Sequence, residues 1–164
     1  MSSTDSRDNS ETPRVWRRVV VKVGTNLLTG GTDHLDSATI AELVSQIADL
    51  RRRGVEVVLV TSGAVTAGRE LMNGRDLSRS RKDVGTRQVL ASLGQVPLMH
   101  EYFSHFNSHG YLAAQALVSR VDLESDHGYL NARNTLLGLI SAGAIPIVNE
   151  NDVVAVEELE GEVF

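Results

Sequence analysis

Three segments of the sequence place polar and small residues directly after short runs of β-branched residues. They are Lys22 to Asn26, Thr61 to Ala64 and Asn149 to Asp152. The carboxyl ends of neighbouring parallel strands lie at one edge of a sheet, so we expect the three segments to converge there. A binding site is therefore predicted where these strands end.

Lys22 is the first candidate, because it lies within the apolar run Val19 to Val23. A lysine in a buried strand either keeps its ammonium near the strand end, close to an anion such as phosphate, or reaches solvent. Gly24 lets a ligand approach the backbone, and its amide can donate to a phosphoryl oxygen. A simple turn is the alternative for this glycine.

Ser62 and Gly63 follow the second apolar run and open a helix. Their amides and hydroxyls can hold a carboxylate or phosphate at the positive end of the helix, or they can simply cap it. The segment is not a serine nucleophile elbow, because no glycine stands two residues before Ser62. Neither a P-loop nor a Gly-x-Gly-x-x-Gly fingerprint occurs, so these two nucleotide sites are not predicted.

Carboxamides are the third signal, at Asn131, Asn134, Asn149 and Asn151. A carboxamide both donates and accepts, which suits a zwitterionic ligand such as an amino acid, although asparagine is also common in turns. Asp152 can orient Lys22 or another cation, or it can be a turn carboxylate.

Two clusters of basic residues have simpler interpretations. His100, His105 and His109 raise a metal hypothesis, but no carboxylate completes the usual zinc pattern, so we predict no metal site. The arginine cluster from Arg79 to Arg87 is interpreted as a solvated loop face.

The elements that must position these segments alternate along the chain. A helix rich in apolar residues at 3–4 spacing follows the first strand, with Asp36 or Ser37 as its N-cap and Gly54 just past its end. Pro97 kinks or divides a later helical region, and Asp126 caps the last helix. The predicted ranges are strands Val19–Val23, Val55–Val60, Tyr111–Val118 and Ala144–Val148, and helices Ile40–Leu50, Ala64–Leu71, Val84–Asn107 and Asp126–Ala142. This alternation predicts a three-layer α/β/α sandwich with a mainly parallel sheet and a right-handed first crossover.

Composition narrows the class of partner. The net charge of −5 disfavours nucleic acid and anionic membranes, and no apolar run approaches the length of a membrane-spanning helix. The absence of cysteine fits a reducing compartment, so a cytoplasmic protein is expected. Residues 1–16 are predicted to form a disordered polar tail. The segment from Val153 to Phe164 is predicted to begin a hairpin that lacks its return strand.

The ordered series of motifs resembles the glutamate 5-kinases of the amino acid kinase superfamily, from about Val19 to the end of the chain. The motifs that carry this resemblance are Val20-Val21-Lys22-Val23-Gly24-Thr25, Val60-Thr61-Ser62-Gly63-Ala64, Ala67-Gly68-Arg69, Gln88-Val89-Leu90-Ala91, Gly94-Gln95, Leu130-Asn131-Ala132-Arg133-Asn134-Thr135 and Ile147-Val148-Asn149-Glu150-Asn151-Asp152.

The resemblance implies ATP-dependent phosphorylation of the γ-carboxylate of L-glutamate, the first step of proline biosynthesis, with Mg²⁺ accompanying the nucleotide. By the same resemblance, Lys22 contacts the transferring phosphate and Asp152 organises the catalytic lysines. Glutamate binding is assigned to Ser62 with Gly63, Asn134 and Asn151, although some members have Asp in place of Asn134. The resemblance assigns binding of the nucleotide phosphates to Lys22, Gly24 and Thr25.

The resemblance also implies that the chain holds only part of a catalytic domain. Residues 17–164 match the amino-terminal, glutamate-binding part, and the nucleotide-binding half of the family is absent from the sequence. We therefore expect little kinase activity from the chain alone, and a homo-oligomer for the complete protein. The alternative is a noncatalytic glutamate-binding or interaction fragment that associates with full-length subunits.

Overall fold

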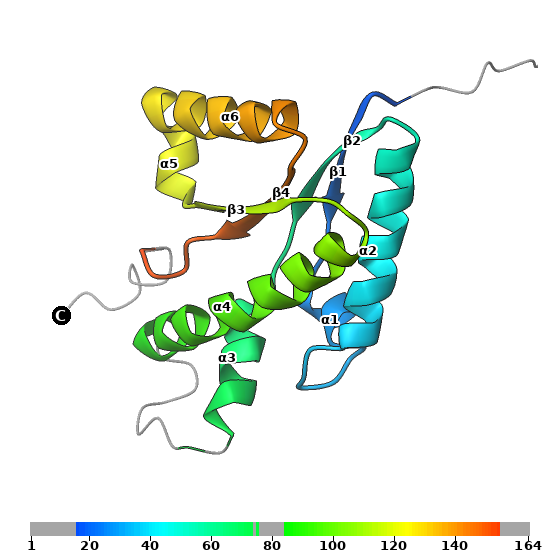
Figure 1. The fold of residues 1–164 in the computed structure, drawn as a ribbon. Coiled ribbons are helices and arrows are strands. Elements are labelled where there is room, and N and C mark those ends of the chain that lie inside the picture. The colour runs from blue at the N-terminus through cyan, green and yellow to red at the C-terminus, as the bar shows by residue number, and fades with distance from the viewer. Residues whose placement is uncertain (1–15, 74, 76–83, 155–164) are drawn as a thin grey trace, which may run out of the picture.

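A computed structural model describes residues 16–73, 75 and 84–154 of the chain. These residues form a four-stranded, entirely parallel sheet with the strand order β1-β2-β4-β3 (Figure 1). The strands are β1 (Arg18–Lys22), β2 (Glu56–Val60), β3 (Ala113–Val118) and β4 (Ile145–Glu150). The helices are α1 (Thr25–Leu28), α2 (Ser37–Arg52), α3 (Ala64–Met72), α4 (Val84–Ser108), α5 (Arg120–Glu124) and α6 (Asp126–Ser141). The predicted α/β class and parallel sheet are confirmed.

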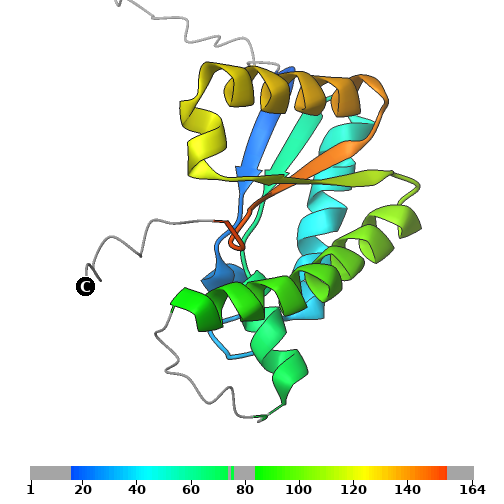
Figure 2. The same ribbon diagram turned by 90° about the vertical axis from the view of Figure 1, so that its left-hand side faces the viewer.

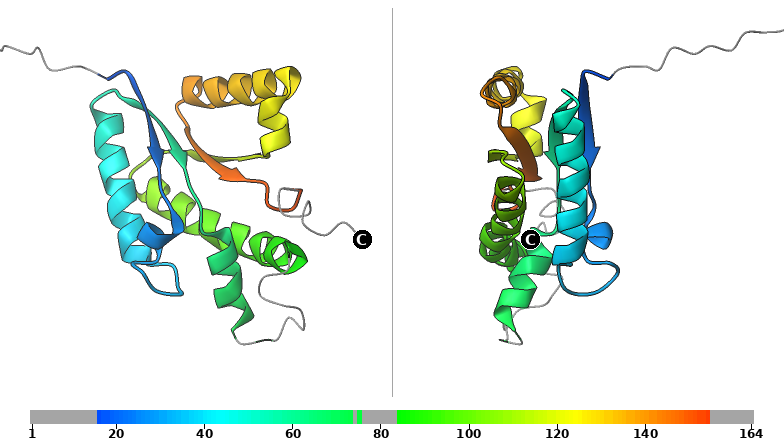
Figure 3. Two further views of the ribbon diagram at one scale, coloured as in Figure 1. Left: turned by 180° about the vertical axis from the view of Figure 1, so that it is seen from behind. Right: turned by 45° about the vertical axis from the view of Figure 1, so that its right-hand side comes forward.

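The helices lie in two layers. α2 and α4 pack on one side of the sheet, and α6 lies across β3 and β4 on the other, so that Figure 1 shows α2 and α6 on opposite sides of the strands. The view from behind shows the same arrangement (Figure 3). The carboxyl ends of β1 and β2 point toward α1 and α3, where Figure 2 shows the first half of α4 passing beside them. The sandwich has three layers, as predicted.

The core lies between the sheet and the layer formed by α2 and α4. Val57 and Leu59 of β2 and Ile145 and Ile147 of β4 are buried and face the same core cluster. β2 is central in the sheet, so it presents a continuous apolar run rather than an alternating one. The first half of the chain and β4 thereby fix the edge at which the polar segments emerge.

The first long helix is formed as the sequence predicts. Asp36 is its N-cap, and its carboxylate accepts hydrogen bonds from the amides of Ala38 and Thr39. A hydrogen bond from the Thr39 hydroxyl, together with these two amide bonds, lowers the pKa of Asp36. Gly54 follows the helix with a φ of 81°, a backbone conformation that favours glycine. The cap and the stop signal therefore act at the two predicted ends.

Several predicted boundaries are wrong. The last helix begins at Asp126, but its N-cap is Ser125, whose hydroxyl accepts from the amide of Gly128. β4 runs on to Glu150, because β3 continues to pair with it as far as Glu150 and then accepts a hydrogen bond from the amide of Asn151. Of the two alternatives for Pro97, division of the helix does not occur, because α4 is a single helix with Pro97 inside it. The four-residue α1 and five-residue α5 were not predicted, since helices this short show no apolar periodicity.

The two ends of the chain remain predictions. The polar tail lies outside the described residues apart from Trp16, and so does all but the first two residues of the predicted hairpin. Val153 and Val154 lie in a turn. None of the described helices combines the length and apolar character that a membrane-spanning helix needs.

Candidate functional site

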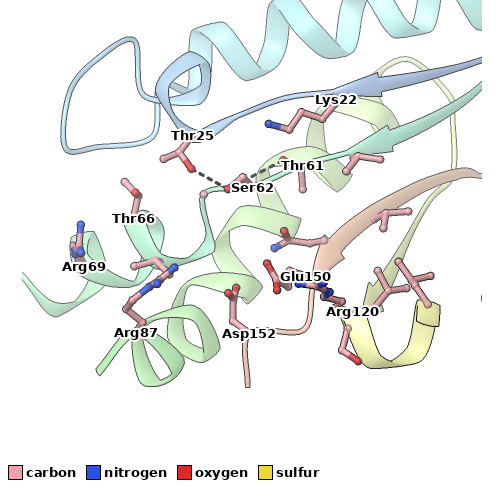
Figure 4. A pocket seen from close by; sticks show the side chains of 18 of the residues that line it. Lys22, Thr25, Thr61, Ser62, Thr66, Arg69, Arg87, Arg120, Glu150 and Asp152 are labelled. Atoms are coloured by element: carbon pink, nitrogen blue, oxygen red, sulfur yellow. Dashed lines mark hydrogen bonds between the residues drawn. The ribbon is translucent and has the colours of Figure 1, made fainter. Parts of the chain in front are cut away.

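A cavity of about 820 Å³ opens at the carboxyl edge of the sheet. The ends of β1, β2 and β4 form one side, and residues of α3, α4 and α5 complete it (Figure 4). Of the predicted site residues, the cavity is lined by Lys22, Thr25, Ser62, Gly63 and Asp152. The three polar segments therefore converge as the strand arrangement predicts.

Lys22 occupies the first strand's end but not a buried position. It is exposed, because the alternation of β1 places it with Val20 on the side of the sheet away from α2. Figure 4 shows its side chain extending toward the cavity. A Cβ at position 24 would be in ordinary contact with the Lys22 ammonium, 3.6 Å away, so the cation lies beside the backbone of Gly24. Gly24 itself is not among the residues that line the cavity.

The Ser62 side chain is positioned by a hydrogen bond with Thr25 and by the turn at Gly63. Its hydroxyl lies 2.9 Å from that of Thr25, which ties the end of β2 to the start of α1. Gly63, the next residue, has a φ of 102°. This backbone angle favours glycine, and a Cβ there would be in contact with Leu28 and Leu35 at 3.4 Å. The turn after β2 thus fixes the Ser62 hydroxyl at the cavity wall.

A buried tyrosine on α4 contacts the turn after β2 from the core side. The hydroxyl of Tyr102, on α4, lies 2.8 Å from that of Thr61, and the Thr61 hydroxyl in turn donates to the carbonyl of Ser62. Burial raises the pKa of Tyr102 to about 12, and the Thr61 bond opposes part of that rise, so the phenol stays neutral. Sequence reasoning missed this contact, because Tyr102 falls on an apolar helix face that reads as ordinary core.

Asp152 lies across the cavity from Lys22 (Figure 4). Partial burial raises the pKa of its carboxyl, and the positive charge of Arg87 opposes that rise. Asp152 forms no ion pair with Lys22 in the structure, and the cation whose charge acts on its carboxyl is Arg87. The prediction that Asp152 orients a cation stays a prediction, with Arg87 as its present neighbour.

Three arginines were not predicted as site residues. Arg69 on α3 and Arg87 on α4 line the end of the cavity nearest those helices, and Arg120 on α5 lines the opposite end, where it pairs with Glu124. Arg87 lies on a helix and not in a loop, although its side chain is exposed as the interpretation of the cluster from Arg79 to Arg87 as a solvated face predicts. Residues 79–83 of that cluster lie outside the described residues. The sequence predicted the helix start at Val84 correctly, but no local pattern shows that Arg87 lies beside the cavity.

Two glycines bring the helices of Arg69 and Arg87 into contact. A Cβ at Gly68 would stand 1.9 Å from the Leu90 carbonyl oxygen, and one at Gly94 would stand 1.8 Å from that of Ala64. Backbone therefore packs directly on backbone between α3 and α4. This contact fixes both helices against the cavity that they line.

The asparagines divide into two groups. Asn149 lines the cavity and is buried. Asn151 does not line it, although its neighbours in sequence, Glu150 and Asp152, do. Asn134 is exposed on α6 and does not line this cavity. Asn131 lies at a second, smaller cavity of about 310 Å³ between β3 and α6. The structure therefore brings Asn149 to the site, but not Asn134.

The histidine cluster has a different role in the structure. The His105 ring lies 3.4 Å from the Glu101 carboxylate, which also accepts a hydrogen bond from Ser37. These contacts join the start of α2 to α4. No group of three metal-ligating side chains occurs in residues 16–73, 75 and 84–154.

Comparison with known proteins matches residues 17–163 to the amino acid kinase family. Similar curated proteins include the glutamate 5-kinases of Dehalococcoides mccartyi, 52% identical over 149 residues, and Chlorobaculum tepidum, 50% identical over 145 residues. The glutamate 5-kinase of Photobacterium profundum is 47% identical over 142 residues. The aligned parts cover 91%, 88% and 87% of this chain, and 39%, 39% and 37% of the relatives. The chain thus spans about two fifths of their length.

Proposed function

Because the chain belongs to the amino acid kinase family, we propose that it carries the glutamate-binding part of a glutamate 5-kinase. The enzyme would transfer the terminal phosphoryl group of ATP to the γ-carboxylate of L-glutamate. The observation that carries the proposal is the convergence of Lys22, Ser62 and Asp152 on one cavity at the carboxyl edge of a parallel sheet. Parallel α/β sheets bind their ligands at that edge.

The residue types in the cavity suit this transfer. A γ-carboxylate has an ordinary pKa near 4.3, so at pH 7 it is an ionised nucleophile that needs no general base. Catalysis then depends on positioning the carboxylate and on neutralising negative charge as the phosphoryl group moves. Lys22 supplies a positive charge at the strand end, and the Ser62 and Gly63 turn supplies donors for a carboxylate. Asp152 lies opposite, where it can face the amino group.

The fit to Mg²⁺ and ATP is partial. Lys22, with Gly24 and Thr25, suits a phosphoryl oxygen, because the Lys22 ammonium lies beside the backbone of Gly24 and both Lys22 and Thr25 line the cavity. When bound, Mg²⁺-ATP would supply the phosphoryl group and screen its charge. Magnesium commonly reaches such sites on the nucleotide's phosphates and needs few protein carboxylates. We assign the adenine and ribose contacts to the part of the relatives that this sequence does not span.

The direct test is a titration of the chain with L-glutamate, monitored by NMR of the backbone amides. We expect the amides of Ser62, Gly63 and Asp152 to shift, and Ser62→Ala to weaken binding about threefold to tenfold. Ser104→Ala is the matched control, because Ser104 is exposed on α4 outside the cavity. An unaltered chain that fails to bind glutamate would overturn the proposal.

A second measurement addresses activity. We expect the chain alone to form no hydroxamate from glutamate, ATP and hydroxylamine at steady state. Glutamate binding that ATP leaves unchanged would favour a noncatalytic glutamate-binding fragment. Tighter glutamate binding in the presence of ATP would favour an enzyme site that this chain shares with further residues. Sustained hydroxamate formation would contradict the expectation that the chain is inactive alone.

A further inference from the structure

Asn149 is a polar residue in an otherwise apolar row. Ile145 and Ile147 of β4 point into the core beneath α4, and the alternation of the strand places Asn149 on the same side. Its side chain is only 4% exposed. A buried carboxamide at the end of such a row needs hydrogen-bonding partners. The position therefore requires an explanation that packing alone does not give.

The backbone of Asn149 is fixed by both neighbouring strands. β4 lies between β2 and β3, and Asn149 is in register with Leu117 of β3. On either side of it, Val148 accepts from the amide of Thr61 and Asn151 donates to Val118. The strand therefore has little freedom to move the Asn149 side chain.

A glutamine on α4 holds that side chain. The Asn149 Nδ2 donates to the Gln95 Oε1 at 2.8 Å. Gln95 follows Gly94, whose contact with Ala64 fixes this part of α4. The Gln95 Nε2 is buried and has no hydrogen-bond partner among the described residues. The hydrogen bond between Asn149 and Gln95 thus leaves the buried Gln95 Nε2 without a partner in the described part of the chain. An unpaired buried donor costs free energy of folding, which a purely structural contact would be expected to avoid.

The remaining atom of the amide is the Asn149 Oδ1. It accepts no hydrogen bond from a described residue, yet it is not among the buried side-chain atoms that lack a partner. It is therefore accessible, and the surface that Asn149 lines is the cavity. A carbonyl oxygen only accepts hydrogen bonds, so its ligand partner must be a donor. In glutamate at neutral pH both carboxylates are acceptors, and the α-ammonium is the donor.

We infer that Asn149 binds the α-ammonium of the amino acid substrate through its Oδ1, and that Gln95 is the positioning residue that aims this oxygen into the cavity. The inference rests on the proposed glutamate site. The pair selects an acceptor that carries an amino group over a plain dicarboxylate. Lys22 and the Ser62 turn serve the acidic groups of the same ligand.

The test compares L-glutamate with glutarate, which has both carboxylates but no amino group. Both are titrated into the 164-residue chain and followed by NMR, which measures weak dissociation constants. We expect Asn149→Leu, which keeps the side chain's shape, to weaken glutamate binding about tenfold or more. Glutarate binding should change by less than about twofold, because glutarate makes no use of the Oδ1.

Gln95 variants test the positioning role without altering residue 149. Gln95→Met removes the acceptor for the Asn149 Nδ2 and should weaken glutamate about threefold to tenfold, again with little effect on glutarate. Gln95→Glu keeps an acceptor at that place and should bind glutamate about as tightly as the unaltered chain. Thermal unfolding of each variant confirms that it is folded.

The outcomes separate this inference from the proposed function. Equal losses for glutamate and glutarate would mean that residue 149 acts on a carboxylate or on structure, which overturns the inference alone. Unchanged glutamate binding in Asn149→Leu would do the same. An unaltered chain that binds neither ligand overturns the glutamate site and the inference together.

Discussion

The two helical layers of the sandwich differ in how they pack against the sheet. The layer of α2 and α4 supplies the largest buried side chains, including Leu98, Tyr102 and Phe106 of α4. The layer of α5 and α6 buries only Ile140, and Tyr129 and Leu130 are about half exposed. The cavity lies between these layers. Its Ser62 and Asn149 are therefore fixed by the core, whereas Arg120 belongs to an element with no buried side chain.

The better packed layer is the one that can hold side chains in a defined position for a ligand. A ligand group that needs a defined partner is served best by side chains locked through packing and further hydrogen bonds. Tyr102 and Gln95, both on α4, provide such bonds beneath Ser62 and beside Asn149. We expect α5 and α6 to exchange their amide hydrogens faster than α4, because local stability follows buried contact. Substitutions in matched pairs, one in each layer, test this contrast.

The largest effect is expected at the glycine contact between α3 and α4. Gly94→Ala places a methyl group 1.8 Å from a backbone oxygen, so the two helices must separate. We expect a loss of roughly 4–5 kcal/mol or more in the free energy of unfolding, at the extreme of single substitutions. Gly138→Ala on α6 is the control, because nothing lies within 4 Å of its added methyl. It should gain about 0.5–1 kcal/mol from helix propensity. Urea unfolding measures both, and similar losses would remove the contrast.

The next effect concerns aromatic side chains in the two layers. Phe106 is fully buried, while Tyr129 is 53% exposed. Phe106→Ala should cost about 3–4 kcal/mol, because it leaves a cavity in the core. Tyr129→Ala should cost about 1 kcal/mol or less, since little packing is removed. Chemical denaturation of both variants provides the measurement. A Tyr129 variant as unstable as the Phe106 variant would show that the outer layer contributes more than its burial indicates.

The sequence predicts the α2 and α4 layer better than the outer one, for a physical reason. Apolar runs and 3–4 spacing reveal β2 and α2 because their burial is deep, and Asp36 and Gly54 mark the ends of that helix. α5 is too short to show an apolar periodicity. Nothing in the sequence marked Ser119, its N-cap, as the start of a helix. In the site, Lys22 ends one strand and Ser62 follows another, so the sequence predicted both at the edge where the cavity lies. Arg87 and the Gln95 contact depend on how two helices meet, which no local pattern encodes.

A smaller effect tests the support beneath the site. Tyr102→Phe removes only the hydroxyl that contacts Thr61, so it should cost about 1 kcal/mol in the free energy of unfolding. Because Thr61 precedes Ser62, we also expect glutamate binding to weaken about twofold to threefold. Tyr111→Phe is the matched control: Tyr111 packs beside Arg51, and its hydroxyl makes no hydrogen bond to a described residue. Equal stability of the two variants would contradict a supporting role for Tyr102.

The smallest effect compares a carboxylate of the cavity with one of the outer layer, Asp152 with Asp122. Burial raises the pKa of Asp152 above its ordinary value of 3.8, so its charged form destabilises the fold. Hydrogen bonds from Ser119 lower the pKa of Asp122 below 3.8, so its charged form stabilises the fold. The two carboxylates should therefore give opposite signs when each is replaced by the neutral amide.

At pH 7 we expect Asp152→Asn to raise the melting temperature and Asp122→Asn to lower it, each by roughly 1–3 °C. The gain in Asp152→Asn should shrink as the pH falls through the raised folded pKa, and it should vanish below the unfolded value, where the native carboxyl is neutral too. The loss in Asp122→Asn should persist above the unfolded value and shrink as the pH falls toward the lowered folded pKa. Melting curves at several pH values measure both. A stabilised Asp152→Asn variant that no longer binds glutamate would show that the cavity keeps this charge at the expense of stability. A destabilised variant would instead make Asp152 part of the scaffold.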